Sequence, residues 1–223
     1  MQEKFQRLLG VIITPRETFQ KIKEKPDILF PFLIVAFGTL VPALIGYPIF
    51  KSFLIKNLND TLQPKGIEVT DFLIKVSLIA AYVGIPINAI LSWLLKGIVI
   101  HPLTKIFNAV GTFREKYKVL LSAIGYSSFT VALGQLVITI IAYIIGSYDV
   151  KTSLALFLPG NLNNTSFIFR LFSHLDFFVI WYQILVSMAV SIIYDIKFKK
   201  SALIVIGTWL IFVLISSIAV IQG

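Results

Sequence analysis

Long runs of apolar residues recur five times along the chain, at residues 28–50, 76–95, 119–146, 174–194 and 201–221. Only the run at 174–194 carries charged residues or histidine, namely His174 and Asp176 near its start. A helix rises about 1.5 Å per residue, so roughly 20 apolar residues cross the hydrocarbon core of a bilayer. The pattern therefore predicts an all-α integral membrane protein, with a bundle of five transmembrane helices over residues 28–223.

Residues 1–27 form an amphipathic segment of a different kind. Its first half carries apolar side chains at helical spacing beside basic ones, namely Phe5, Leu8, Leu9 and Ile12. Thr14-Pro15-Arg16-Glu17 is a helix-start signal, because threonine can cap and proline suits the first helical position. The second helix would end at Pro26, and Phe19 and Ile22 would form its apolar face. We expect two short interfacial helices, either a membrane anchor or docking surface, or only a basic lead-in to the first span.

Helix-breaking residues interrupt the first two predicted spans. Gly46-Tyr47-Pro48-Ile49 and Gly84-Ile85-Pro86-Ile87 share one pattern. Pairs of interrupted helices build binding sites in some transporters, because the freed backbone groups line a cavity. Proline kinks are also common in membrane helices, so the pattern alone does not separate these interpretations.

Basic residues set the expected orientation. The chain has a formal net charge of +9, and 14 of its 20 Lys and Arg residues fall before the first span or in the second-to-third and fourth-to-fifth connections. By the positive-inside rule, the N-terminus is cytoplasmic and the C-terminus extracytoplasmic. A third helix starting at the capping box Thr112-Phe113-Arg114-Glu115 would project toward the cytoplasm. The basic residues are scattered over loops, which favours the lipid bilayer and anionic lipid headgroups as partners and excludes nucleic acid.

Polar residues within the spans are the candidate functional groups: Asp176, Asn88, Gln135, Gln183 and His174. A carboxylate inside a span is costly, which favours a proton or cation relay centred on Asp176 with Gln183 on the same stripe. The alternative is structural, because Ser173-His174-Leu175-Asp176 is itself a capping box before an apolar run. Asn88 and Gln135 fit hydrogen bonds between helices.

The chain contains two histidines and no cysteine. Thiolate metal sites, disulfides and cysteine catalysis are therefore excluded, and no spacing typical of a catalytic or zinc site is present. We expect no catalytic residue, no metal, no cofactor and no enzymatic activity.

Several of these segments resemble the Yip (Ypt-interacting protein) domain family. Leu175-Asp176-Phe177-Phe178-Val179-Ile180-Trp181 is similar to the opening of that family's fourth helix. Three further segments fit in the same order: 14–19, the stretch from Trp93 through Gly97 and His101 to 111–113, and 200–203. The resemblance implies five membrane helices and a cytoplasmic N-terminus. The short N-terminal segment of this chain resembles the bacterial or archaeal branch of the family, which implies a location in the cell (inner) membrane. The GTPase binding known for eukaryotic relatives is therefore not expected of this chain.

Two classes of function follow from the sequence. The first is a non-enzymatic membrane protein that organises lipid or docks partner proteins, including a second copy of itself, through a basic cytoplasmic surface. The second is a transporter or channel for an ion, small solute or lipid, based on the interrupted spans and the polar residues within them.

Overall fold

The computed structural model describes residues 2–107, 113–147, 150, 152–159 and 166–219. Within these residues the regular elements are helices, apart from one isolated antiparallel bridge between Ser153 and Asp176. In chain order the helices are α1 (Gln2–Ile13), α2 (Pro15–Glu24), α3 (Leu29–Ile45), α4 (Tyr47–Leu62), η1 (Gln63–Lys65), α5 (Asp71–Leu103), η2 (Thr104–Phe107), α6 (Phe113–Ile145), η3 (Leu154–Phe157), α7 (Phe167–Ser173), α8 (Phe177–Tyr194) and α9 (Phe198–Ala219).

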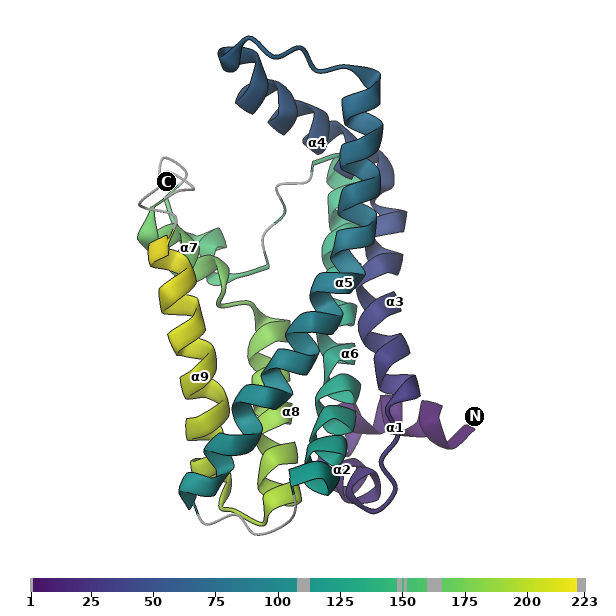
Figure 1. The fold of residues 1–223 in the computed structure, drawn as a ribbon, viewed down its shortest axis with the longest axis vertical. Coiled ribbons are helices and arrows are strands. Elements are labelled where there is room, and N and C mark those ends of the chain that lie inside the picture. Colours follow the sequence, from purple (N-terminus) through teal and green to yellow (C-terminus); the bar gives the residue numbers. More distant parts are fainter. Residues whose placement is uncertain (1, 108–112, 148–149, 151, 160–165, 220–223) are drawn as a thin grey trace.

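The long helices run up and down through the molecule, and α1 lies at the opposite end of the bundle from the last turn of α9 (Figure 1). Within the described residues, four helices are long and apolar enough to cross a membrane: α5, α6, α8 and α9. A fifth crossing is formed if α3 and α4, which meet at a bend of 80°, are taken as one broken span. The predicted all-α membrane bundle is confirmed.

The first span ends earlier than predicted. Helix α3 stops at Ile45, and Gly46 separates it from α4. Pro48 has no N–H to donate to the preceding turn and its ring crowds the carbonyl there, which favours a break at this position. The hydroxyl of Tyr82 donates a hydrogen bond of 3.0 Å to the carbonyl of Ala43 beside the bend. Beyond the bend the chain is again helical, as α4, which extends past the predicted end of the span at residue 50.

The second and fourth spans also differ from the prediction. Helix α5 is continuous through Pro86, so the second Gly-x-Pro-Ile pattern does not break it, and α5 extends well beyond 76–95 at both ends. Helix α8 begins at Phe177 rather than at residue 174, because Asp176 caps it. The long third helix is confirmed as α6, although the capping residue Thr112 lies outside the described residues.

Helix α6 is the central element, since it packs along α3, α5 and α8. A close approach occurs at Gly125, where an added Cβ would lie 2.5 Å from Pro31 Cβ and 3.2 Å from Trp93 Nε1. Trp93 Nε1 donates to the carbonyl of Leu121 at 2.9 Å, which fixes the indole against this turn of α6. The absence of a side chain at Gly125 therefore lets three helices meet.

We expect Gly125→Ala to lower the free energy of unfolding in detergent by about 1–3 kcal/mol, because the new methyl group overpacks a contact with a rigid proline ring. Gly84→Ala is the matched control, since its Cβ would meet no atom within 4 Å. Alanine loses less backbone entropy on folding than glycine does, so the free energy of unfolding of that variant should be unchanged or higher by up to about 1 kcal/mol. Equal stability of the two variants, measured by SDS titration, would contradict the close packing at Gly125.

Candidate functional site

Helices α1 and α2 form a layer that lies across one end of the bundle (Figure 1). The layer packs on α6 and α8, and three of its side chains are fully buried there: Val11, Phe19 and Ile22. The two short helices and the start at Pro15 are as predicted, although Thr14 forms no side-chain cap. Phe19 and Ile22, predicted as part of an interfacial or docking face, are instead fully buried and complete the protein's own core.

The opposite face of α1 is apolar and open. Phe5 is 54% exposed, Leu9 56% and Ile13 74%, and these residues follow one another at intervals of four. Leu8 and Ile12, predicted to belong to the same face, are half-buried on the flank of the helix. We call Phe5, Leu9 and Ile13 the α1 stripe. An apolar stripe on a helix that crosses the end of a membrane bundle is typical of an interfacial helix.

A buried arginine holds α1 in this orientation. Arg7 is 5% exposed and faces the bundle. Its Nη1 donates to the carbonyl of Lys25 at 2.7 Å and lies 3.8 Å from Asp27 Oδ2, while its Nη2 donates to Glu3 Oε1 at 2.7 Å. The guanidinium is thereby tied to α1 itself and to the connection between α2 and α3. Because its hydrogen bond and charge favour the carboxylate, Arg7 holds the pKa of Glu3 below its usual range.

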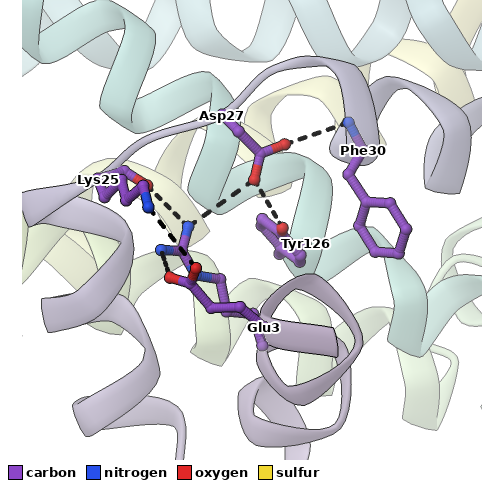
Figure 2. A network of polar contacts seen from close by, with 6 residues as sticks. Glu3, Lys25, Asp27, Phe30 and Tyr126 are labelled. Carbon is purple, nitrogen blue, oxygen red and sulfur yellow. Dashed lines mark hydrogen bonds and ion pairs between the residues drawn. The ribbon is translucent and has the colours of Figure 1, made fainter. Parts of the chain in front are cut away.

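Asp27 is the junction between this layer and the membrane bundle (Figure 2). Its Oδ2 accepts a hydrogen bond of 2.8 Å from the Tyr126 hydroxyl on α6, and its Oδ1 accepts one of 3.1 Å from the amide of Phe30 in the first turn of α3. One carboxylate thus joins α1, α3 and α6. Sequence reasoning missed the network, although an aspartate directly before an apolar span was a usable signal of a helix start.

Lys23 joins α2 to the end of α8, and we call its contacts there the Lys23 clasp. Lys23 Nζ donates to the carbonyl of Ile192 at 2.7 Å and forms an ion pair with Asp195, 3.0 Å from Oδ1. Asp195 is the C-cap of α8 and has a left-handed backbone conformation with φ of 54°. This conformation ends α8 and turns the chain toward α9 within reach of Lys23.

A groove of about 1060 Å³ lies beside this clasp. Its walls come from α2, the last turns of α8, the connection after it and the start of α9. The lining residues are Arg16, Gln20, Lys23, Glu24, Met188, Ser191, Ile192, Asp195, Ile196 and Phe198. The groove combines a polar wall on α2 with a largely apolar wall on α8 and α9.

Asp176, the sharpest candidate from the sequence, is an N-cap. Its Oδ1 accepts hydrogen bonds from the amides of Phe178 at 2.8 Å and Val179 at 3.3 Å, and its Oδ2 accepts one from the Thr152 hydroxyl. The capping interpretation is therefore confirmed, with one correction: Asp176 itself is the cap, and Ser173 instead ends α7. One carboxylate oxygen thus caps α8, and the other joins the start of α8 to the segment that contains Thr152.

Gln135 and Asp176 do come close in space, because both line a cleft of about 360 Å³ at the other end of the bundle. Gln183 is buried elsewhere and accepts a hydrogen bond of 2.6 Å from Lys96 Nζ. The same ammonium lies 3.9 Å from the ring centroid of Tyr182. Lys96 is therefore turned inward to α8.

The remaining polar candidates lie apart from this cleft. Asn88 is exposed on α5 and accepts a hydrogen bond of 3.3 Å from the hydroxyl of Ser92. His174 lies 3.2 Å from the Ser216 hydroxyl through Nε2, and burial lowers the pKa of its imidazole. In the part of the chain that the structure describes, no three His, Asp or Glu side chains gather in a way that could hold a metal ion. The five predicted polar residues therefore do not form one common site.

Comparison with known families assigns the fold. The family model described as the Yip1 domain matches residues 9–220 of the 223-residue chain. The chain belongs to the Yip1 domain family. No curated protein and no solved structure matches it. The match begins at residue 9, inside α1, so it covers the second part of α1, all of α2 and the helices of the membrane bundle.

For this Yip1 domain we expect Asp176→Ala to lower the free energy of unfolding by about 0.5–2 kcal/mol, because the first amides of α8 lose their acceptor. Asp176→Asn should retain most of the stability, since asparagine caps helices about as well as aspartate. Urea or SDS titration of the three proteins measures the difference. If Asn were as damaging as Ala, the negative charge rather than the cap would be the essential property.

We expect Arg7→Met to loosen α1 from the Yip1 bundle, at a cost of about 1–3 kcal/mol, because Asp27 and the Lys25 carbonyl lose a buried donor. A nitroxide on Gln6→Cys reports this as increased mobility, and the absence of native cysteine makes its labelling specific.

Lys4→Met is the control, since Lys4 lies on the same helix outside the Arg7 network. In the wild type, the ion pair with Arg7 lowers the pKa of Glu3 in the folded state. The stabilisation that Glu3 gives to the attachment of α1 is therefore present above the pKa of Glu3 in the unfolded chain, and it is lost as the pH falls through the lowered pKa of the folded state. Mobility at Gln6 should therefore rise in acid for the wild type and change less for Arg7→Met. Equal mobility of wild type and Arg7→Met at neutral pH would rule out the proposed anchoring of α1.

Proposed function

We propose that this Yip1 domain protein acts without catalysis and gathers anionic lipid at the membrane surface on which its α1–α2 layer lies. We further propose that this surface is the cytoplasmic face of the cell membrane. The observation that supports the proposal is the rigid attachment of α1 with the α1 stripe turned away from the bundle.

Basic side chains surround this layer. Exposed Lys and Arg residues occur in α2, in η2, at the start of α6 and between α8 and α9, all at the end of the bundle where α1 lies: Arg16, Lys21, Lys25, Lys105, Lys118, Lys197, Lys199 and Lys200. Each basic residue near an anionic membrane surface contributes about 1 kcal/mol of attraction. The apolar α1 stripe supplies insertion, and the surrounding cations supply selectivity for anionic headgroups.

A cytoplasmic location of this end is supported by the positive-inside rule, because most of the basic residues of the chain lie in the segments that the fold brings together here. The cytoplasmic leaflet is also the one that carries anionic lipid. Charge and lipid distribution therefore favour the same orientation.

Transport is the weaker alternative. It relied on two interrupted spans, whereas only the first is broken and α5 continues through Pro86. Asn88 is exposed on α5, Gln183 is bonded to Lys96, and Asp176 caps α8. These groups do not line one path. Docking of a partner protein would use the same α1 stripe and is separated from lipid binding by the experiment below.

The experiment places a fluorophore on Gln6→Cys in α1 and reconstitutes the protein into vesicles. Nitroxide-bearing phosphatidylglycerol or phosphatidylcholine, labelled close to the headgroup, then quenches the dye at short range. We expect severalfold stronger quenching by the anionic lipid at equal mole fraction. Replacing Lys21, Lys197 and Lys199 by glutamine should remove most of the difference, because these cations create the local selectivity.

The matched control is the same dye on Asn57→Cys in α4, at the opposite end of the bundle, where we expect little preference between the two lipids. Equal quenching by both lipids at Gln6 would contradict the proposed function. Weak quenching by both at Gln6 would show that α1 does not contact lipid, and would support a protein partner on the α1 stripe.

A further inference from the structure

We propose that the groove between α2 and the end of α8 binds a single anionic phospholipid. This inference rests on the proposed function, because the groove would be the one specific site within a generally anion-attracting surface. Its volume of about 1060 Å³ lies just above the roughly 300–1,000 Å³ range of small-molecule sites.

One wall of the groove is a polar row on α2. Arg16, Gln20 and Lys23 line it at spacings of four and three residues, which places them on one side of the helix. Phe19 and Ile22 face the bundle and are fully buried, so α2 cannot roll without exposing them. The polar row is therefore held toward the groove by the packing of the other side of α2.

The other wall is apolar and leads toward the membrane interior. Met188 and Ile192 line the groove on α8, and Ile184 continues their row at the same spacing of four, with all three side chains partly exposed. Ile196 and Phe198 complete the apolar wall after the end of α8. A row of this kind offers an acyl chain a continuous path from the helix end into the hydrocarbon layer.

The charges around the groove favour an anion at the Arg16 end. Lys23 is occupied by Asp195 and by the Ile192 carbonyl, so this pair contributes little net charge. Glu24 also lines the groove, but it lies eight residues from Arg16, about 12 Å along the helix. Arg16 is exposed and forms no ion pair within the described residues.

Three exposed lysines follow the groove in sequence, at positions 197, 199 and 200. They add positive charge beside Ile196 and Phe198. The geometry therefore favours a headgroup phosphate bound by Arg16 and an acyl chain along the row of Ile184, Met188 and Ile192. A phospholipid has this polarity along its length, and the groove lies at the helix ends where headgroups reside.

The test is native mass spectrometry of the full-length protein released from detergent in the presence of equal phosphatidylglycerol and phosphatidylcholine. We expect one retained phosphatidylglycerol on the wild type. In the double variant Arg16→Gln, Gln20→Trp, which removes the cation and fills the groove, its dissociation constant should rise at least tenfold. Both positions are exposed, so the substitutions leave the core intact.

The matched control is Lys21→Trp, which likewise removes one positive charge and adds one tryptophan, at a neighbouring exposed position of α2 outside the groove. It should retain the lipid. Persistence of the adduct in the groove variant, or its equal loss in the control, would overturn the proposal. Displacement of the lipid by soluble glycerol phosphate would overturn it as well, because the site would then recognise free phosphate.

The two proposals fail separately. If the adduct does not depend on the groove while Gln6 still shows preferential quenching by phosphatidylglycerol, the groove inference is wrong and the proposed function stands. If Gln6 shows no preference for the anionic lipid, the proposed function is wrong whatever the mass spectrum shows.

Discussion

The arrangement of this protein depends on the pairing of one buried cation. Arg7 lies within the contact between α1 and the bundle, where an unpaired charge would cost several kcal/mol. The carbonyl of Lys25 and the carboxylate of Glu3 accept hydrogen bonds from its two terminal nitrogens, and the carboxylate of Asp27 lies 3.8 Å away and accepts hydrogen bonds from Tyr126 and Phe30. The network works only if α1, α3 and α6 meet in one geometry.

That geometry has consequences for the surface of the molecule. With Arg7 facing inward, the α1 stripe must face outward, and α2 is left to bury Phe19 and Ile22 on α8. The clasp between Lys23 and Asp195 then fixes the distance between α2 and the end of α8, which keeps the groove open. Removal of the N-terminal segment would expose core residues, so point substitutions are the appropriate test of its role.

Much of the fold could be predicted from the sequence, because long apolar runs and the proline at position 15 act locally. The long third helix and the two short N-terminal helices followed from periodicity alone. Tertiary contacts decided the rest. Pro48 ends a span while Pro86 does not, and the difference depends on the neighbouring helices, which supply partners such as Tyr82 at the first bend.

The candidate site was less predictable than the fold. A charge pattern counts Arg7 with the other basic residues of the N-terminal segment, and it does not reveal that this one is buried. Lys96 is a second example, because it turns inward to Gln183 on a helix that is distant in the sequence. Partners of this kind determine where a long side chain ends, and the charge pattern does not reveal them. The local sequence favoured a capping role near Asp176, but it named Ser173 as the start of the helix, whereas Asp176 itself is the cap.

The Yip1 domain match starts at residue 9, so it includes α2 and the second part of α1 together with the membrane bundle. The central claim is that this layer is an integral, lipid-facing part of the fold. Hydrogen exchange of residues 2–24 in lipid nanodiscs tests it most directly. The account predicts that α2 is protected about as strongly as α8 in any lipid, and that α1 gains protection when phosphatidylglycerol is included. Exchange of α1 and α2 at the rate of an unstructured peptide, with or without anionic lipid, would contradict it.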